Sequence, residues 1–159
     1  MNKKVLAFVI VLGALIIGLS GLLVYRMFFY QQKLHEPKAI KIVDTIKDYD
    51  YKLEDRDSEL YITTFNELKT LLSKKEVNEK EYAKLLTKLF IIDFYTLDNK
   101  NNKYDVGGLE FIDAADLVTF KNYAMASHYK NVKDNTYGSR KQKLPVVMSV
   151  DVINVEDTS

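Results

Sequence analysis

The chain has 159 residues, of which 47% are hydrophobic and 28% charged, and these values are typical of one globular domain of ordinary size. Its formal net charge is +1 and it holds no long basic stretch, so nucleic acid is not an expected partner. The absence of cysteine excludes disulfides, thiolate catalysis, cysteine-ligated zinc and a lipoprotein anchor.

The first element along the chain is an uncharged run of 21 residues from Val5 to Tyr25. A helix of this length covers about 30 Å, the thickness of the hydrocarbon core of a bilayer. The run therefore predicts a transmembrane helix within a signal anchor of residues 1–30. Lys3 and Lys4 precede it and Arg26 follows it, so local charge alone does not set its orientation. The short amino tail favours a single-pass protein of the cell membrane with its carboxyl domain outside.

Two other interpretations of this run stay open. A cleaved signal peptide would use Lys3 and Lys4 as its basic start, residues 5–17 as its apolar region and residues 18–20 as its cleavage site. Apolar residues continue to Tyr25 and resume after Arg26 with residues 27–30, and a mature amino terminus would have to expose them, which argues against cleavage. The third interpretation is a buried core helix, but so long an uncharged run has almost no amphipathic break.

Residues 31–39 follow as a polar juxtamembrane linker, and the folded domain is expected over residues 40–159. Its first predicted element is an extended segment from Tyr49 to Glu54. Tyr49, Tyr51 and Leu53 alternate there with charged residues, which is typical of a strand with one face buried.

Three helices are predicted next from capping residues and apolar spacing. Asp57 or Ser58 can cap the first, Asn78 caps the second and Asp113 caps the third. The apolar faces comprise Tyr61, Phe65, Leu68 and Leu72 in the first helix, Tyr82, Leu85, Leu86, Leu89 and Ile92 in the second, and Leu117, Phe120 and Ala124 in the third.

The last predicted element is a strand over residues 146–155, which are rich in β-branched side chains. A single strand cannot satisfy both of its edges, so we expect it to pair with the segment around Tyr49 to Leu53 and to leave one edge open. The predicted fold class is an N-terminal transmembrane helix followed by an α+β domain. That domain is mainly helical, with about three helices and a small β-sheet whose completeness stays open.

A polar loop from Asp98 to Gly108 separates two apolar runs and invites comparison with metal and phosphate loops. Calcium loops need oxygen ligands at set positions, but counting from Asp98 places lysine at position 3 and at position 6. Phosphate loops need glycines before a Lys-Ser or Lys-Thr pair, which the chain lacks here. Gly107 and Gly108 are therefore interpreted as a turn with positive φ that returns the chain to the core. No metal site and no cofactor are predicted.

Asp93 lies near the apolar face of the second predicted helix, four residues after Leu89. A carboxylate there needs a hydrogen-bond donor or a basic partner, because an unpaired buried charge is costly. We interpret Asp93 mainly as a carboxylate that ties the helix to a loop backbone, and a general acid with a raised pKa is the functional alternative. Neither histidine forms a pair with a serine, since His128 and Ser127 are neighbours that do not face each other on a helix.

Three stretches resemble segments of single-pass membrane proteins of low-GC Gram-positive bacteria: "ELYITTFNELKTLL", "YAKLLTKLFIIDFYTLDNKNNKYDVGGLEFI" and "YGSRKQKLPVV". The order of three helices and then a strand is also similar to the cone fold of nuclear-transport-factor-like domains, which include periplasmic scaffolds of type IV secretion. In that fold several long strands follow the helices, whereas one is predicted here. The resemblance implies no catalytic residues.

Two classes of function stay open. The first is a membrane-anchored, extracytoplasmic interaction or scaffold module of the bacterial cell envelope, without catalysis, which binds a protein partner or itself through the C-terminal strand. The second is an envelope hydrolase or a small-ligand-binding domain, whose pocket between helices and sheet would include Asp93, Tyr95, Tyr104 and Asp105. A concave pocket with converging polar groups would favour the second class, and a filled core the first.

Overall fold

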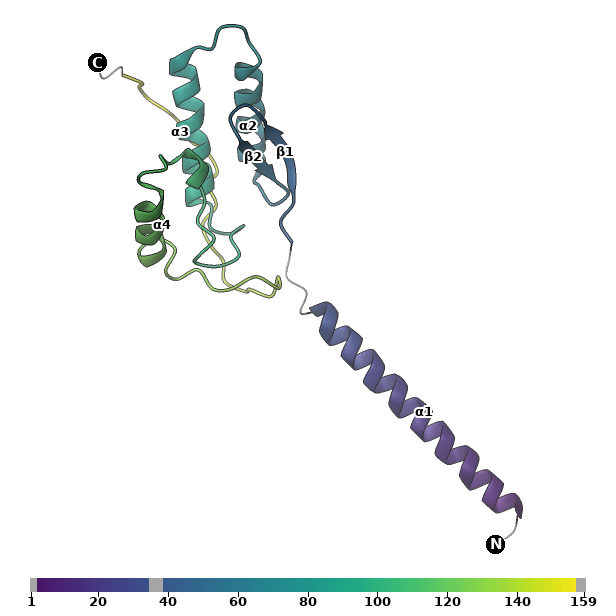
Figure 1. Ribbon diagram of the computed structural model, residues 1–159. Coiled ribbons are helices and arrows are strands. Elements are labelled where there is room, and N and C mark those ends of the chain that lie inside the picture. The colour runs from purple at the N-terminus through teal and green to yellow at the C-terminus, as the bar shows by residue number, and fades with distance from the viewer. Residues whose placement is uncertain (1–2, 35–38, 157–159) are drawn as a thin grey trace. The chain divides into compact units, whose positions relative to one another are not determined.

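The computed structural model describes residues 3–34 and 39–156 of the chain. It divides into two compact units, Met1–Pro37 and Lys38–Ser159. Within the described residues, the first unit holds the helix α1 and the second holds two strands, three α-helices and one short 3-10 turn (Figure 1). The predicted linker of residues 31–39 overlaps the end of α1, and its residues 35–38 lie outside the described part of the chain.

The helix α1 runs from Lys3 to Leu34 and carries exposed apolar side chains such as Leu15 and Ile17. It is longer than the predicted span and includes the charged residues Lys3, Lys4 and Arg26. Among the residues that the structure describes, no helix is both long enough and apolar enough to cross a membrane. The predicted transmembrane helix is therefore wrong. The predicted signal anchor, the cell-membrane location and the external carboxyl domain rested on that helix and are corrected with it.

The second unit begins with a β-hairpin of β1 (Ile42–Ile46) and β2 (Tyr51–Glu54), which pair antiparallel with a register irregularity between Ile42 and Asp44. Asp50 has a φ of 57° in the connecting turn, a left-handed conformation that aspartate tolerates better than most residues. Alternation predicted the strand around Tyr51 correctly. The prediction that this strand pairs with the C-terminal segment is wrong, because residues 42–46 pair with β2 instead.

Two antiparallel neighbours, α2 (Glu59–Leu72) and α3 (Glu79–Tyr95), form the main helical layer beside the hairpin (Figure 1). The side chain of Ser58 accepts a hydrogen bond from the backbone N–H of Tyr61, and that of Asn78 accepts one from Glu81. Both predicted N-caps are thus confirmed, with Ser58 rather than Asp57 in the first position. The buried faces of the two helices and the hairpin enclose one core of apolar side chains: Ile46, Leu53, Tyr61, Phe65, Leu68, Leu71, Leu85, Leu89 and Ile92.

The chain after α3 forms the polar loop, the turn η1 (Leu109–Phe111) and the helix α4 (Leu117–Ala126). The N-cap position of α4 is Asp116, whose side chain makes no capping hydrogen bond. Asp113 lies in the turn before the helix, where its side chain accepts from the Ala115 N–H at 2.8 Å and its carbonyl accepts from Asp116 and Leu117. The third helix therefore begins later than the predicted cap implied. The end of α3, the polar loop, α4 and the segment after α4 together form a second apolar core, which consists of Phe94, Leu97, Val106, Ala124, Tyr129 and Val132.

Residues 146–155 form no strand, so the predicted C-terminal strand is wrong as an element of this fold. The segment follows an uncoiled path along α3, drawn in yellow in Figure 1. The N–H of Val147 donates to the Thr96 side-chain oxygen at 3.2 Å, and the carbonyl of Pro145 accepts from Leu97 and Asp98. Val147 and Val150 pack against the first core. The segment is therefore held by side chains and its amino end rather than by a β-ladder.

Candidate functional site

A pocket of about 190 Å³ opens between the hairpin, the helices α2 and α3 and the polar loop. The hairpin contributes the end of β2, the helices contribute the start of α2 and the end of α3, and the loop contributes its glycines and η1. The lining residues are Lys52, Glu54, Arg56, Asp57, Tyr61, Asp93, Lys100, Asp105, Val106, Gly107, Gly108, Leu109 and Glu110. Eight of these side chains are ionisable carboxylates or bases, so the pocket is strongly polar.

Two charged residues of the pocket, Asp93 and Lys100, form a salt bridge. The Lys100 side chain is only 2% exposed, and the other carboxylate oxygen of Asp93 accepts a hydrogen bond from the Gly108 N–H at 2.6 Å. Asp93 therefore ties the end of α3 to the loop backbone, as the sequence interpretation proposed. The basic partner that the interpretation required is Lys100, seven residues further along, and nothing in the spacing singled it out.

Gly107 and Gly108 each allow the loop backbone to approach Asp93 at the end of α3, for different reasons. A Cβ atom on Gly107 would lie 2.4 Å from the backbone oxygen of Asp93, a distance that no side chain tolerates. Gly108 has a φ of 74° and is the residue that adopts the predicted left-handed conformation. The Gly107 N–H donates to the Tyr129 hydroxyl at 3.1 Å, and that hydroxyl donates to the Phe94 carbonyl at 2.6 Å. The glycine pair thus brings the loop backbone against α3.

Arg56 holds the opposite wall of the pocket together. Its guanidinium pairs with both oxygens of Asp105, donates to Glu54 at 2.7 Å and donates to the Asn99 carbonyl at 3.2 Å. Burial would raise the pKa of Asp105, but the hydrogen bonds from Arg56 and from the Asn101 backbone lower it below the usual value. Asp105 is therefore an ionised carboxylate engaged in closing the loop.

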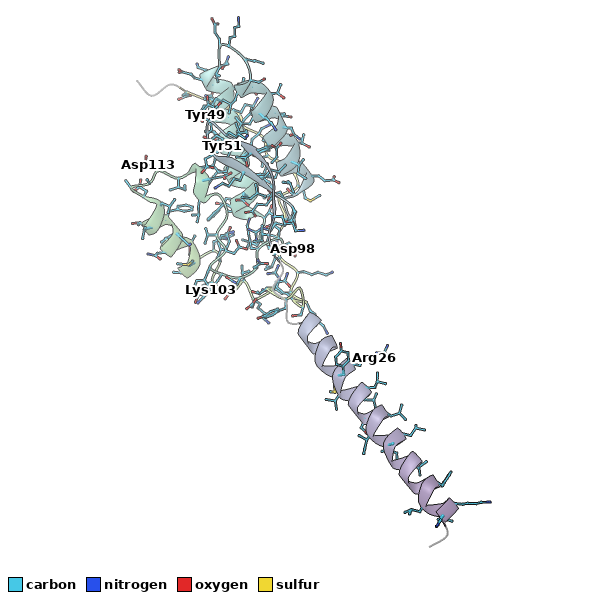
Figure 2. All side chains as sticks on the ribbon, turned by 45° about the vertical axis from the view of Figure 1, so that its right-hand side comes forward. Arg26, Tyr49, Tyr51, Asp98, Lys103 and Asp113 are labelled. Atoms are coloured by element: carbon cyan, nitrogen blue, oxygen red, sulfur yellow. The ribbon has the colours of Figure 1, made fainter. Side chains whose placement is uncertain are left out.

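Two of the four predicted pocket residues lie outside the pocket. Tyr95 is 46% exposed and packs edge-on against His128, with 5.1 Å between ring centroids. Tyr104 is 61% exposed, with the Lys103 ammonium 5.0 Å from its ring centroid. Lys103 lies with Asp98 on the polar loop, away from Tyr49 and Tyr51 on the hairpin (Figure 2). The structure therefore places Asp93 and Asp105 in one pocket, whereas Tyr95 and Tyr104 lie on other surfaces.

Asp57 and Glu110 are two carboxylates of the pocket that the sequence did not indicate as site candidates. The Asp57 carboxylate accepts a hydrogen bond from the Glu54 N–H at 2.7 Å. Glu110 accepts from the Tyr61 hydroxyl at 2.9 Å and from the Lys52 N–H at 3.3 Å. The sequence indicates Asp57 only as a possible helix cap. Glu110 follows the glycine pair and belongs to no recognisable motif.

Asp57 and Glu110 differ from the other carboxylates of the pocket because their partners are neutral donors. Burial raises the pKa of Asp57 to about 6, and the charge of Asp93 adds to the shift. Burial likewise raises the pKa of Glu110 to about 7, with Asp93 and Asp57 as further causes. Glu110 is exposed as a residue while its carboxyl group is turned against Tyr61, so solvent still screens this group. Both carboxyl groups titrate close to neutral pH.

The raised pKa values of Asp57 and Glu110 predict how the free energy of unfolding depends on pH. Each holds its proton more tightly in the folded chain than in the unfolded chain, where carboxyl groups titrate near 4. The folded state therefore binds more protons between about pH 4 and about pH 7, and the free energy of unfolding falls as the pH rises through this window. Replacing Asp57 with asparagine should make the free energy of unfolding decrease less with pH. It should also add about 1 kcal/mol to the free energy of unfolding at pH 8.

Urea unfolding of the full chain and of Asp57→Asn at pH 4.5 and pH 8 measures this effect. Glu79→Gln, on the exposed first turn of α3, serves as the matched control and should keep the original pH dependence. Equal stability of the wild-type chain at both pH values, or a slope that Asp57→Asn leaves unchanged, would contradict the assignment.

Within the described part of the chain, no group of three or more His, Cys, Asp or Glu side chains is arranged to hold a metal ion. Comparison of the chain with protein-family models, with curated proteins and with solved structures finds no match. The resemblance to bacterial single-pass proteins therefore stays a prediction, and the chemistry of the pocket is the main guide to function.

Proposed function

We propose that the second unit of the chain is a binding domain for a small, positively charged ligand, which it holds in the pocket without chemical conversion. The observation that carries this proposal is the pairing of charges inside the pocket. Lys100 is engaged by Asp93, and Arg56 is engaged by Asp105 and Glu54. These two basic groups are therefore already neutralised, and the third base of the pocket, Lys52, pairs with Asp50 at 3.4 Å, which disfavours an anionic ligand.

The acidic groups are not neutralised in the same way. Asp57 and Glu110 have only backbone or hydroxyl donors as hydrogen-bond partners among the described residues. Among these residues no cation is hydrogen-bonded to either carboxyl group, and the nearby charge of Lys100, which lowers the pKa of Asp57, is outweighed by burial. An ammonium group between the two would supply a positive charge and hydrogen-bond donors together.

The size of the pocket limits the ligand. Its volume of about 190 Å³ is below the range of about 300 to 1,000 Å³ that is usual for drug-sized ligands. A short alkylamine or diamine fits this limit. Metal ions are a poorer match, because the described carboxylates do not converge in a metal-binding arrangement.

Calorimetric titration of the full chain with putrescine and, separately, with methylammonium tests the proposal, with acetate as the anionic control. At least one amine should bind at pH 8. Its affinity should fall about tenfold or more at pH 5, because protonation of Asp57 and Glu110 removes the negative charges that attract it. The double variant Asp57→Asn/Glu110→Gln should lose binding at pH 8.

Glu67→Gln is the matched control for the amine titration, because Glu67 is an exposed acid of α2 outside this pocket. It should bind the amine as the wild type does. No heat from either amine at millimolar concentration, or binding that survives the double substitution, would overturn the proposal.

A hydrolytic function is the second candidate, and the pKa of Glu110 favours it. A carboxyl group with a pKa of about 7 beside the Tyr61 hydroxyl could exchange protons with a bound substrate at neutral pH. A panel of chromogenic ester and glycoside substrates separates the two functions. Turnover that Glu110→Gln abolishes would establish the hydrolase. The interaction module predicted from the sequence is a separate proposal and concerns a different surface.

A further inference from the structure

We propose that residues 146–156, called here the C-terminal segment, pair antiparallel with the same segment of a second copy of this chain and form an intermolecular two-stranded ribbon. The occupant of this surface is thus a second copy. The inference is independent of the pocket and of its ligand, because the C-terminal segment contributes no residue to the pocket lining.

The first observation is a run of backbone without hydrogen bonds. Val147 is the last residue of the chain whose N–H has a partner in the described structure, the Thr96 hydroxyl. From residue 148 to residue 156, no backbone N–H or C=O is bonded to any described residue. A series of backbone donors and acceptors without partners can be satisfied by an extended strand that pairs along it.

The second observation is that the segment is already anchored on the domain. Val147 and Val150 pack against the first core, so the segment is held on the domain rather than free. The apolar side chains of Met148 and Ile153 are 82% and 99% exposed, respectively. β-branched residues dominate this stretch, which favours an extended conformation. The segment thus has the composition of a strand, a fixed position and exposed apolar side chains that pairing would cover.

The sequence of the segment also allows it to pair with itself. In an antiparallel register centred on Val150, Met148 faces Val152 across the ribbon and Asp151 faces Ser149. Val147 likewise faces Ile153, Val146 faces Asn154, and no like charges lie directly opposite each other. A second copy supplies the required strand without any other protein.

The outer edges of the hairpin are less suited to pairing with a strand of a second copy. On β2, the Lys52 N–H donates to Glu110 and the Lys52 carbonyl lies 3.5 Å from the Tyr61 hydroxyl that donates to it. On β1, the Thr45 N–H donates to the Asp44 side chain at 2.8 Å. Side chains thus occupy backbone groups on both strands, while the C-terminal segment keeps its groups open.

Register-specific disulfide trapping tests the proposal, since the chain contains no cysteine of its own. The full-length variants Met148→Cys and Val152→Cys are mixed and oxidised with oxidised glutathione. The mixture should yield mainly the heterodimer that joins position 148 to position 152, and each variant alone should yield several-fold less disulfide-linked dimer. Tyr123→Cys, on the exposed surface of α4, is the control partner for Met148→Cys and should give little dimer.

Proline substitutions give a second readout by sedimentation of the full chain over a range of concentrations. In an antiparallel ladder only every second residue directs its N–H to the partner. One of Met148→Pro and Ser149→Pro should therefore weaken dimer formation much more than the other, with both melting temperatures close to that of the wild type. Equal trapping in all cysteine mixtures, including the Tyr123 control, or equal association of both proline variants would overturn the proposal.

Discussion

The substitution Gly107→Ala should lower the free energy of unfolding of the full chain by about 3 kcal/mol or more. The added Cβ would lie 2.4 Å from the Asp93 carbonyl oxygen and 2.8 Å from the Asp93 carboxyl carbon. The obstacle is largely backbone, so rotation of a side chain cannot relieve it. Moving the loop away would also strain the bonds from the Gly107 N–H to Tyr129 and from the Gly108 N–H to Asp93.

Gly138→Ala provides the matched control for this loss. Gly138 has a φ of 69°, yet a Cβ there would meet nothing within 4 Å. This variant carries only the cost of a left-handed alanine, about 1 to 2 kcal/mol. Chemical denaturation of both variants and the wild type at one pH measures the difference. A Gly107→Ala chain that is as stable as Gly138→Ala would show that the loop does not approach α3 as closely as the structure indicates.

The parts of the fold that the sequence predicted correctly are those determined by neighbours along the chain. Ser58 and Asn78 cap helices because a short polar side chain reaches a backbone N–H three residues later. Gly108 adopts a positive φ for an equally local reason, the absence of a Cβ atom. Such features follow from a few consecutive residues, so a single sequence is sufficient to find them.

The errors concern features that depend on distant partners or on a whole segment. The β-branched residues 146–155 suggested a strand, but β-structure also requires a neighbouring edge, and residues 42–46 had already paired with β2. In the same way, an uncharged run at the start of the chain predicted a membrane span, and the described helices include none that qualifies. Composition alone did not indicate where α1 would begin and end, nor that it would include Arg26.

The candidate site was predicted in part for the same physical reason. Asp93 was predicted because a carboxylate on an apolar helix face needs a partner. Asp105 was predicted only as one of the polar residues of a pocket between helices and sheet. Asp57, Tyr61 and Glu110 come from segments up to 53 positions apart in the chain, and only the tertiary fold brings them into one pocket. No local pattern could identify that convergence.

Lys100→Met should be nearly as damaging as the glycine substitution, with a loss of about 3 kcal/mol in the free energy of unfolding. Methionine has a similar volume to lysine, so the decrease in the free energy of unfolding measures the removal of the charge rather than the creation of a cavity. The substitution leaves the Asp93 carboxylate with the Gly108 N–H as its remaining described hydrogen-bond partner in a site where Lys100 is 2% exposed. Asp93→Asn should cost a comparable amount, because it leaves the buried ammonium without an opposite charge.

The double variant Asp93→Asn/Lys100→Met separates a true ion pair from two independent packing effects. It should cost about 2 kcal/mol less than the sum of the single variants, since each substitution removes the charge that the other had left unpaired. Lys69→Met is the control for a surface pair, because Lys69 and Asp44 are bonded at 2.6 Å but much more exposed, and its loss should be far smaller. Denaturant unfolding of all five chains completes the cycle. Additive losses would mean that Asp93 and Lys100 do not stabilise each other. The pairing of charges on which the proposed cation pocket depends would then have to be abandoned.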